Sequence, residues 1–111
     1  MVPPSTEINN LHAHICSAVS DPTRILLLYA LADGPCNVTQ LTEALGQPQS
    51  TVSRHLAILR GAGLVWAERS GRQVVYALSD DRVIQALELM RSILADRVIK
   101  HADLLSETDA A

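Results

Sequence analysis

The side chains best suited to chemistry in this 111-residue chain lie close together in the middle of the sequence. Helical spacing places one set of polar residues on a single exposed face, namely Ser50, Thr51, Arg54 and His55. Hydroxyl groups can reach phosphates and base edges, and an arginine can pair with guanine through two hydrogen bonds. The pattern is therefore suited to the major groove of double-stranded DNA.

Basic residues are concentrated in the same part of the chain. Four arginines stand against one glutamate between Ser50 and Tyr76, whereas the rest of the chain carries five basic and eleven acidic residues. The net charge is −3, but phosphate contacts depend on the local potential, so a positive region on an acidic protein can bind DNA. The charge pattern alone does not distinguish a DNA-binding surface from a solvated face on which basic residues cluster by chance.

Two helices are predicted before this region. The second begins at Asp21, whose carboxylate can cap free backbone N–H groups, and Pro22 suits the first helical position because it has no N–H. The run from Ile25 to Leu31 is apolar on nearly all sides, which predicts a buried central helix that ends at Gly34 and Pro35. The first helix follows from apolar residues at helical spacing after Ser5: Ile8, Leu11, Ile15 and Val19.

A helix-turn-helix is predicted next. Asn37 and Gln40 have the spacing of a capping box at the start of a third helix, and Gly46 ends it. A fourth helix starts at Gln47-Pro48 and ends at Gly61 and Gly63. Its apolar positions are Val52, Leu56 and Leu59. Two short helices joined by a glycine-containing turn form a helix-turn-helix, whose second helix carries the polar face described above.

The apolar period then changes from 3.6 to 2. Leu64–Glu68 and Gln73–Leu78 form a predicted hairpin around a turn that contains Gly71. Arg69 and Arg72 at its tip can straddle the DNA backbone beside the groove. This is the arrangement of a winged helix-turn-helix.

A long final helix completes the predicted fold. Ser79 is expected to cap it, with Asp80 and Asp81 at the positive end of its dipole, and it should run to about Leu105. It carries two apolar stripes, one for its own domain and one for a second subunit: Val83, Leu87, Met90, Leu94 and Val98, and Ala86, Leu89, Ile93 and the stem of Arg97. The expected fold class is mainly α with a small β-hairpin, in the order α-α-α-α-β-β-α, as a single domain over residues 1–111.

Four motifs in one order resemble the ArsR/SmtB family of bacterial repressors. They are Asp21-Pro22-Thr23-Arg24, the segment Gln49–Leu56, the segment Leu59–Val65 and the segment Gly71–Tyr76. The resemblance spans roughly Leu11 to Met90. One departure is Gln47, where the family usually has a serine or threonine cap.

The resemblance implies a homodimer formed through the first and last helices. It also implies repressor activity on an inverted-repeat operator in double-stranded DNA, with release by a small inducer. The residues that match the recognition helix and the wing are the expected DNA contacts: Gln49, Ser50, Thr51, Ser53, Arg54, His55, Arg69 and Arg72.

Two sensing sites of the family are absent from this sequence. Where some members carry a cysteine pair on the third helix, this chain has Asn37 and Thr39. Where others carry ligands on the last helix, both histidines are missing, and the aligned residues are Asp80, Arg82, Ile93 and Asp96. Zinc or nickel is therefore not expected at that position.

Cys16 and Cys36 remain as soft ligands. His12 lies four residues before Cys16 and shares its helix face, whereas His14 points elsewhere. Three interpretations stay open. The thiolates bind a thiophilic metal or metalloid such as cadmium or arsenite, with His12 as a further donor, or they form a disulfide or polysulfide bridge, or both pack as small apolar side chains. His101 is expected to be a solvated residue near a helix end.

Composition bounds the remaining function classes. Hydrophobic residues make up 48% and aromatic residues only 3%, so the core must be aliphatic and a shared interface is favoured. The sequence lacks a run of eighteen apolar residues and a basic-then-apolar start, and two cysteines suit a reducing cytoplasm. Without a phosphate loop, nucleophile motif or hydrolase-like metal spacing, an enzyme is not expected. The competing interpretation is a winged-helix module that binds protein through the same surface.

Overall fold

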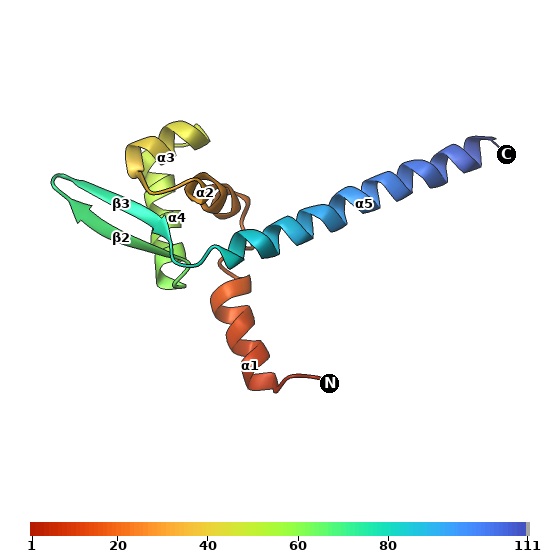
Figure 1. Cartoon of the computed structure of the whole chain (residues 1–111), viewed down its shortest axis with the longest axis horizontal. Coiled ribbons are helices and arrows are strands. Elements are labelled where there is room, and N and C mark those ends of the chain that lie inside the picture. Colours follow the sequence, from red (N-terminus) through yellow and green to blue (C-terminus); the bar gives the residue numbers. More distant parts are fainter. Residues whose placement is uncertain (111) are drawn as a thin grey trace. The chain divides into compact units, whose positions relative to one another are not determined.

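A computed structural model describes residues 1–110, with side chains described for residues 1–97 and for Lys100. The chain divides into two compact units, Met1–Asp81 and Arg82–Ala111. The first unit holds five helical segments and a three-stranded sheet, and the second is the helix α5 (Figure 1). The predicted helix-turn-helix followed by a wing is confirmed.

The predicted first helix is present but changes type along its length. It begins as α1 (Ser5–Asn10) and continues as the π-helix η1 (Leu11–Cys16). The Ser17 N–H donates to the His12 carbonyl at 2.9 Å, which is a bond across five residues instead of four. Such π-helical turns are uncommon and often lie at functional positions.

Helix α2 (Pro22–Ala32) begins as predicted. The Asp21 side chain accepts from the N–H groups of Thr23 and Arg24, with Pro22 at the first helical position. Leu27, Leu28 and Leu31 are buried, as expected for a buried central helix, but that expectation is wrong for Leu26, which is 51% exposed. One side of this apolar run therefore packs in the core, whereas Leu26 remains exposed to solvent.

The helix-turn-helix consists of α3 (Val38–Leu45) and α4 (Gln49–Gly61). The Asn37 side chain accepts from the Gln40 N–H while the Gln40 side chain accepts from the Asn37 N–H, so the predicted capping box is confirmed. Gly46 ends α3 in the left-handed conformation with φ 65°. Val52, Leu56 and Leu59 of α4 are fully buried, as the spacing predicted.

The sheet has one strand more than the sequence indicated. The wing is the hairpin of β2 (Val65–Ser70) and β3 (Gln73–Leu78), and the additional strand β1 (Cys36–Asn37) pairs antiparallel with β3. The strand order is β1-β3-β2. Ser70 pairs with Gln73, and Gly71 has φ 63°, as a two-residue hairpin turn requires at its first position. A strand of two residues leaves no periodic pattern, so β1 cannot be predicted from the sequence.

Helix α5 (Arg82–Ala110) is the whole of the second unit. It begins three residues after Ser79, so the prediction that Ser79 caps it is wrong; the Ser79 N–H donates instead to the Leu64 carbonyl at 3.0 Å. Four apolar side chains of α5 are each more than half exposed: Leu89, Met90, Ile93 and Leu94. The side chains of Val98 and His101 lie outside the described residues.

The core of the first unit is aliphatic. The six largest fully buried side chains come from the three packed helices α2, α3 and α4: Leu27, Leu28, Leu41, Val52, Leu56 and Leu59. This core fixes the position of the helix-turn-helix, from which the wing extends (Figure 1). Among the described residues, no helix is long and apolar enough to cross a membrane.

The turn between α3 and α4 depends on the conformation of Gly46. We expect Gly46→Ala to lower the free energy of unfolding by about 1 kcal/mol, because an L-residue is strained at positive φ. Gly61→Ala is the matched control, since a Cβ at either glycine would meet nothing within 4 Å but Gly61 is helical. Urea denaturation should show the control to be neutral or more stable. Equal losses in both variants would contradict the role of the Gly46 backbone.

Candidate nucleic-acid interface

The N-terminal half of α4 presents most of the predicted recognition residues to solvent. Gln49, Ser50, Ser53 and Arg54 are exposed, and Thr51 is half-buried. The same helix buries Val52 and Leu56, and the 3.6-residue period therefore turns the polar positions outward. The exposed side chains offer hydroxyl, amide and guanidinium groups on one surface.

The start of α4 is also free of a side-chain cap. Pro48 occupies the N-cap position, and no side chain accepts a hydrogen bond from the first turn. Gln47, which replaces the expected cap residue, instead accepts a hydrogen bond from the Thr23 hydroxyl at 3.2 Å and so ties the turn to α2. The positive end of the α4 dipole and its first N–H groups are thus available to an anion such as a phosphate.

His55 does not belong to the exposed face. The helical pattern predicted that it lies with the DNA-contacting residues, but the residue is buried, at 8% exposure. Its Nδ1 lies 3.0 Å from Nη1 of Arg24 and 3.9 Å from Oδ1 of Asp21. The polar character of histidine misled the prediction, because a helical pattern cannot distinguish an exposed polar residue from one that has a buried partner. We therefore remove His55 from the set of expected DNA contacts.

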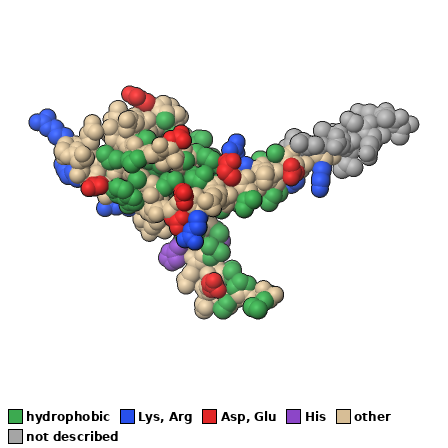
Figure 2. All heavy atoms as spheres, in the orientation of Figure 1, with side chains coloured by type: hydrophobic (Ala, Val, Ile, Leu, Met, Phe, Trp, Pro, Cys, Tyr) green, Lys and Arg blue, Asp and Glu red, His purple; other side chains and the backbone are tan. Residues whose placement is uncertain are grey.

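The wing carries its two arginines on exposed positions. Arg72 lies in the turn, whereas Arg69, predicted at the tip, is within β2 opposite Val74. Glu68, the nearest acid in sequence, points to the opposite face of the hairpin because strand side chains alternate. Trp66 lies on that face too, nearer the base of the wing, and is 43% exposed. Figure 2 shows basic side chains gathered at the wing end of the first unit.

A hydrogen bond that the sequence did not indicate joins the wing to the helix-turn-helix. Nδ2 of Asn37 donates to Oε1 of Gln73 at 3.2 Å, while Oδ1 of Asn37 caps α3. Asn37 and Val75 are register partners, so Gln73 lies two residues further along the same face of β3. One amide thus fixes both the start of α3 and the strand that holds the turn. The contact cannot be predicted from the sequence, because it depends on the pairing of β1 with β3.

Asp21 has a lowered pKa. Partial burial alone would raise it, but the hydrogen bonds that the carboxylate accepts from the backbone N–H groups of Arg24 and Thr23, together with its electrostatic interactions with His55 and Arg24, bring the pKa below its ordinary value of 3.8. The carboxylate is therefore ionised at neutral pH beside the Arg24 guanidinium.

The two cysteines lie in different surroundings. Both are free thiols; Cys16 is exposed at the end of η1, and Cys36 is half-buried in β1. The Cys36 Sγ is 3.6 Å from the Gly34 carbonyl and 3.9 Å from the Ala30 carbonyl. His12 and His14 are exposed on η1. In the described part of the chain, no three or more His, Cys, Asp or Glu side chains come together as a metal site would require.

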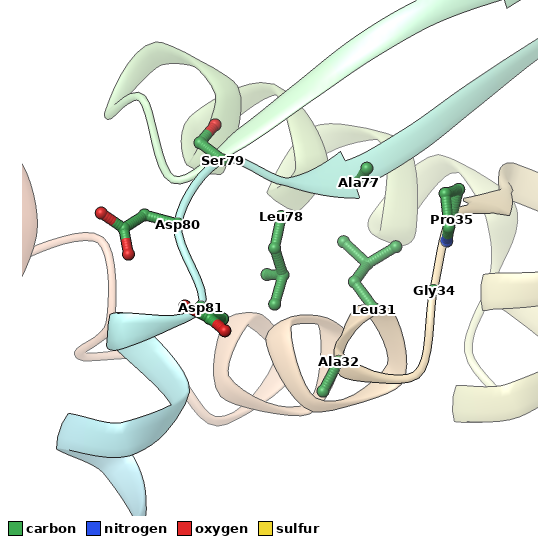
Figure 3. Close-up of a pocket in the computed structure, with 9 residues that line it drawn as sticks. All are labelled: Leu31, Ala32, Gly34, Pro35, Ala77, Leu78, Ser79, Asp80 and Asp81. Carbon is green, nitrogen blue, oxygen red and sulfur yellow. The ribbon is translucent and has the colours of Figure 1, made fainter.

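A hollow of about 330 Å³ lies between the end of α2 and the end of β3 (Figure 3). Leu31 and Leu78 give it an apolar lining, and Asp80 and Asp81 lie on the connection after β3. Asp80 is one of the residues that aligned with a metal position of the family. The hollow contains no thiol or imidazole, so it does not bring together the soft ligands that the sequence singled out.

Comparisons with known proteins identify relatives of this architecture. Residues 21–66 match the family model described as bacterial regulatory protein, arsR family. The chain is 50% identical over 84 residues to the HTH-type transcriptional regulator CmtR of Mycobacterium tuberculosis, which covers 75% of this chain and 71% of that protein. It is 42% identical over 78 residues to the HTH-type transcriptional repressor SmtB of the same organism, covering 70% of this chain and 58% of that one.

Solved structures give the same result. The NMR structure of the cadmium metal-sensor CMTR from M. tuberculosis superposes with a TM-score of 0.59 and 50% identity, covering 68% of this chain and 79% of that one. A homodimeric winged helix-turn-helix DNA-binding domain, Mb0332 from Mycobacterium bovis, superposes with a TM-score of 0.72 and 26% identity. That superposition covers 91% of this chain and 93% of the other.

The lowered pKa of Asp21 predicts a loss of stability in acid. Since the folded protein holds the Asp21 proton less tightly than the unfolded chain, the ionised carboxylate stabilises the fold above about pH 4, and this contribution is lost as the pH falls through the lower folded pKa. Asp21→Asn keeps a capping acceptor but removes the charge, and should flatten the acid limb of unfolding free energy against pH. Asp33→Asn, at the other end of α2, controls for the loss of one negative charge. An unchanged acid limb in Asp21→Asn would contradict the assignment.

Proposed function

Because the chain belongs to the arsR family of bacterial regulatory proteins, we propose that it is a homodimeric repressor that binds an inverted-repeat DNA operator and is released by a small inducer. Its relatives are transcriptional regulators, and the chain is accordingly a regulator and not an enzyme. The observation that carries the proposal is the exposed polar start of α4 beside a basic wing in one compact unit. A protein that binds chromosomal DNA in a bacterium acts in the cytoplasm.

In this proposal α4 enters the major groove and the wing lies along the adjacent backbone. Arg54 reads a base edge, while Ser50, Ser53 and Gln49 contact phosphates or base edges near it. The uncapped first turn of α4 supports a phosphate contact from its N–H groups. Thr51 is half-buried and contributes at the margin of the contact. Arg69 and Arg72 are exposed on the wing and also contribute at its margin. His55 takes no direct part because it is buried.

Exposed apolar side chains support the homodimer. Leu89, Met90, Ile93 and Leu94 lie within two turns of α5 and are exposed in the single chain, and Ile8 and Leu11 are exposed on the first helix. Contiguous apolar surface of this kind marks an interface. Two-fold symmetry would then set the recognition helices about 34 Å apart, one turn of DNA, which matches an inverted repeat.

Three kinds of inducer are compatible with this function. The first is a thiophilic ion held by Cys16 and Cys36, with His12 as a further donor; soft thiolates suit cadmium or arsenite, and the related CMTR is a cadmium sensor. A full set of donors would need the second subunit, since one described chain does not gather three of them. The second is oxidation or reactive sulfur at the same thiols, which the exposure of Cys16 supports. The third leaves both thiols as packing residues and assigns the inducer to another site.

The competing function is a winged-helix module that binds protein. It would use the same fold and the exposed apolar faces, without need for arginines in the wing. DNA titrations at low ionic strength distinguish the two, because phosphate contacts make the affinity fall steeply with salt. A weak and salt-independent response would favour the protein-binding module.

Arg54 and Arg72 should contribute to DNA binding in different ways. We expect Arg54→Ala to cost about 1–3 kcal/mol at the preferred operator and to relax base preference, because a base contact is lost. Arg72→Ala should weaken all sequences similarly and reduce the slope of log affinity against log salt by about 1. Fluorescence anisotropy at several salt concentrations measures both quantities. If Arg72→Ala kept the full salt slope, the phosphate role of the wing would be wrong.

The thiols are tested on the reduced protein bound to DNA from upstream of its own gene. Cadmium, arsenite or polysulfide is titrated into the wild type, Cys16→Ser and Cys36→Ser, with operator affinity as the readout. A sensor at both thiols predicts that one reagent lowers the wild-type affinity by about 5- to 150-fold and leaves both variants bound. Tight binding that no thiol reagent changes would mean that both cysteines only pack.

A further inference from the structure

Arg24 joins three parts of the first unit through one guanidinium group. Its Nε donates to the Ala18 carbonyl at 2.6 Å, and its Nη2 donates to the Ser17 carbonyl at 3.3 Å. Its Nη1 lies 3.0 Å from Nδ1 of His55. Since arginine has only donors, this hydrogen bond requires Nδ1 to be the acceptor. The planar guanidinium thus connects the end of the first helix, the start of α2 and the middle of α4.

Asp21 holds this arginine in place. Its carboxylate accepts the backbone N–H of Arg24 at 3.3 Å and that of Thr23 at 2.8 Å, which fixes the first turn of α2. Its Oδ1 is 3.9 Å from Nδ1 of His55, too far for a hydrogen bond. The Nδ1 of His55 therefore depends on Arg24 for its partner, and the ring is buried, so losing Arg24 would leave a buried acceptor next to a carboxylate.

His55 is well placed to fix the orientation of α4. It lies next in sequence to Arg54, and its buried ring prevents the helix from rotating or sliding without breaking the hydrogen bond to Arg24. The packing between the first helix and the end of α4 gives less support, because a hollow of about 200 Å³ lies there, lined by residues from both: Ala13, His14, Ser17, Ala18, Ile58, Gly61 and Ala62. The polar connection through Arg24 is thus the specific link between the two segments.

We infer that Arg24 and His55 are positioning residues for DNA recognition, and that they transmit the state of the first helix at Cys16–Ala18 to the recognition helix α4. Ser17 and Ala18 directly follow Cys16, the exposed thiol at the end of η1. A ligand or adduct on Cys16 that shifts these carbonyls changes the position of the guanidinium, and with it the position of His55 and the exposed side chains beside it. This inference rests on the proposed function and adds the regulatory route to it.

The first test replaces His55 in two ways. Asparagine places an amide oxygen near the position of Nδ1 and can accept from Arg24, whereas leucine fills the space without an acceptor. We expect His55→Leu to lower the ratio of operator to non-specific DNA affinity by roughly tenfold, as for a lost base contact, while non-specific affinity stays within about twofold. His55→Asn should restore most of the ratio. Arg24→Lys keeps the positive charge but cannot make the three contacts of the guanidinium, to Ala18, Ser17 and His55. It should therefore lower the affinity ratio as much as His55→Leu does.

A purely structural role predicts a different result. Both His55 variants would then lose stability in urea denaturation, yet their operator-to-non-specific ratio would equal that of the wild type under conditions where each is folded. That outcome overturns the inference while the repressor function stands. A wild type that binds no DNA in a salt-dependent way overturns the proposed function, and the inference with it.

The transmission is tested by an adduct at one thiol. In a Cys36→Ser background, alkylation of Cys16 with N-ethylmaleimide should lower operator affinity at least fivefold. In the same background with His55→Leu it should change affinity by less than twofold, because the link to α4 is already broken. Amide hydrogen exchange gives a readout without DNA: the adduct should raise exchange within α4 only when His55 is present. Equal effects of the adduct in both backgrounds would overturn the transmission.

Discussion

The burial of aliphatic side chains between α2, α3 and α4 is the constraint on which the structure depends. With aromatic residues at 3% and no phenylalanine, the core is built from side chains of similar size, and the six that are fully buried come from these three helices. A helix that buries Val52, Leu56 and Leu59 turns Ser53 and Arg54 outward, because the period is 3.6 residues. The same packing that stabilises the unit therefore determines which side chains of α4 can meet a ligand.

Polar residues at the edge of this core set the finer geometry. Asn37 caps α3 and also bonds to Gln73 of the wing, and Arg24 connects the first helix to α4 through His55. Apolar packing tolerates small rotations, whereas a hydrogen bond of about 3 Å has a directional minimum. The two kinds of interaction are complementary: leucines give the unit its stability, and a few amide, guanidinium and imidazole groups fix the angles between its elements.

Much of this architecture follows from the sequence because its signals are local. The caps at Asp21 and Asn37, the glycine at position 46 and the buried stripe of α4 each depend on residues less than two turns apart. Several features that the sequence did not indicate are contacts between distant segments. His55 looked like an exposed polar residue because its partner lies 31 positions earlier, and β1 was missed because its two residues acquire strand geometry only by pairing with β3. Gln47 bonds to Thr23 rather than capping its own helix for the same reason.

The chain contains a single tryptophan, and Trp66 lies in the wing strand β2, opposite Ala77 and partly open to solvent. Indole emission shifts in wavelength and intensity with the polarity around the ring. Because no second indole contributes, the tryptophan emission of the unlabelled protein, excited at wavelengths that the two tyrosines do not absorb, comes from the base of the wing alone. The wild-type chain therefore carries its own optical reporter, which can follow changes around the wing in real time without a dye or an engineered residue.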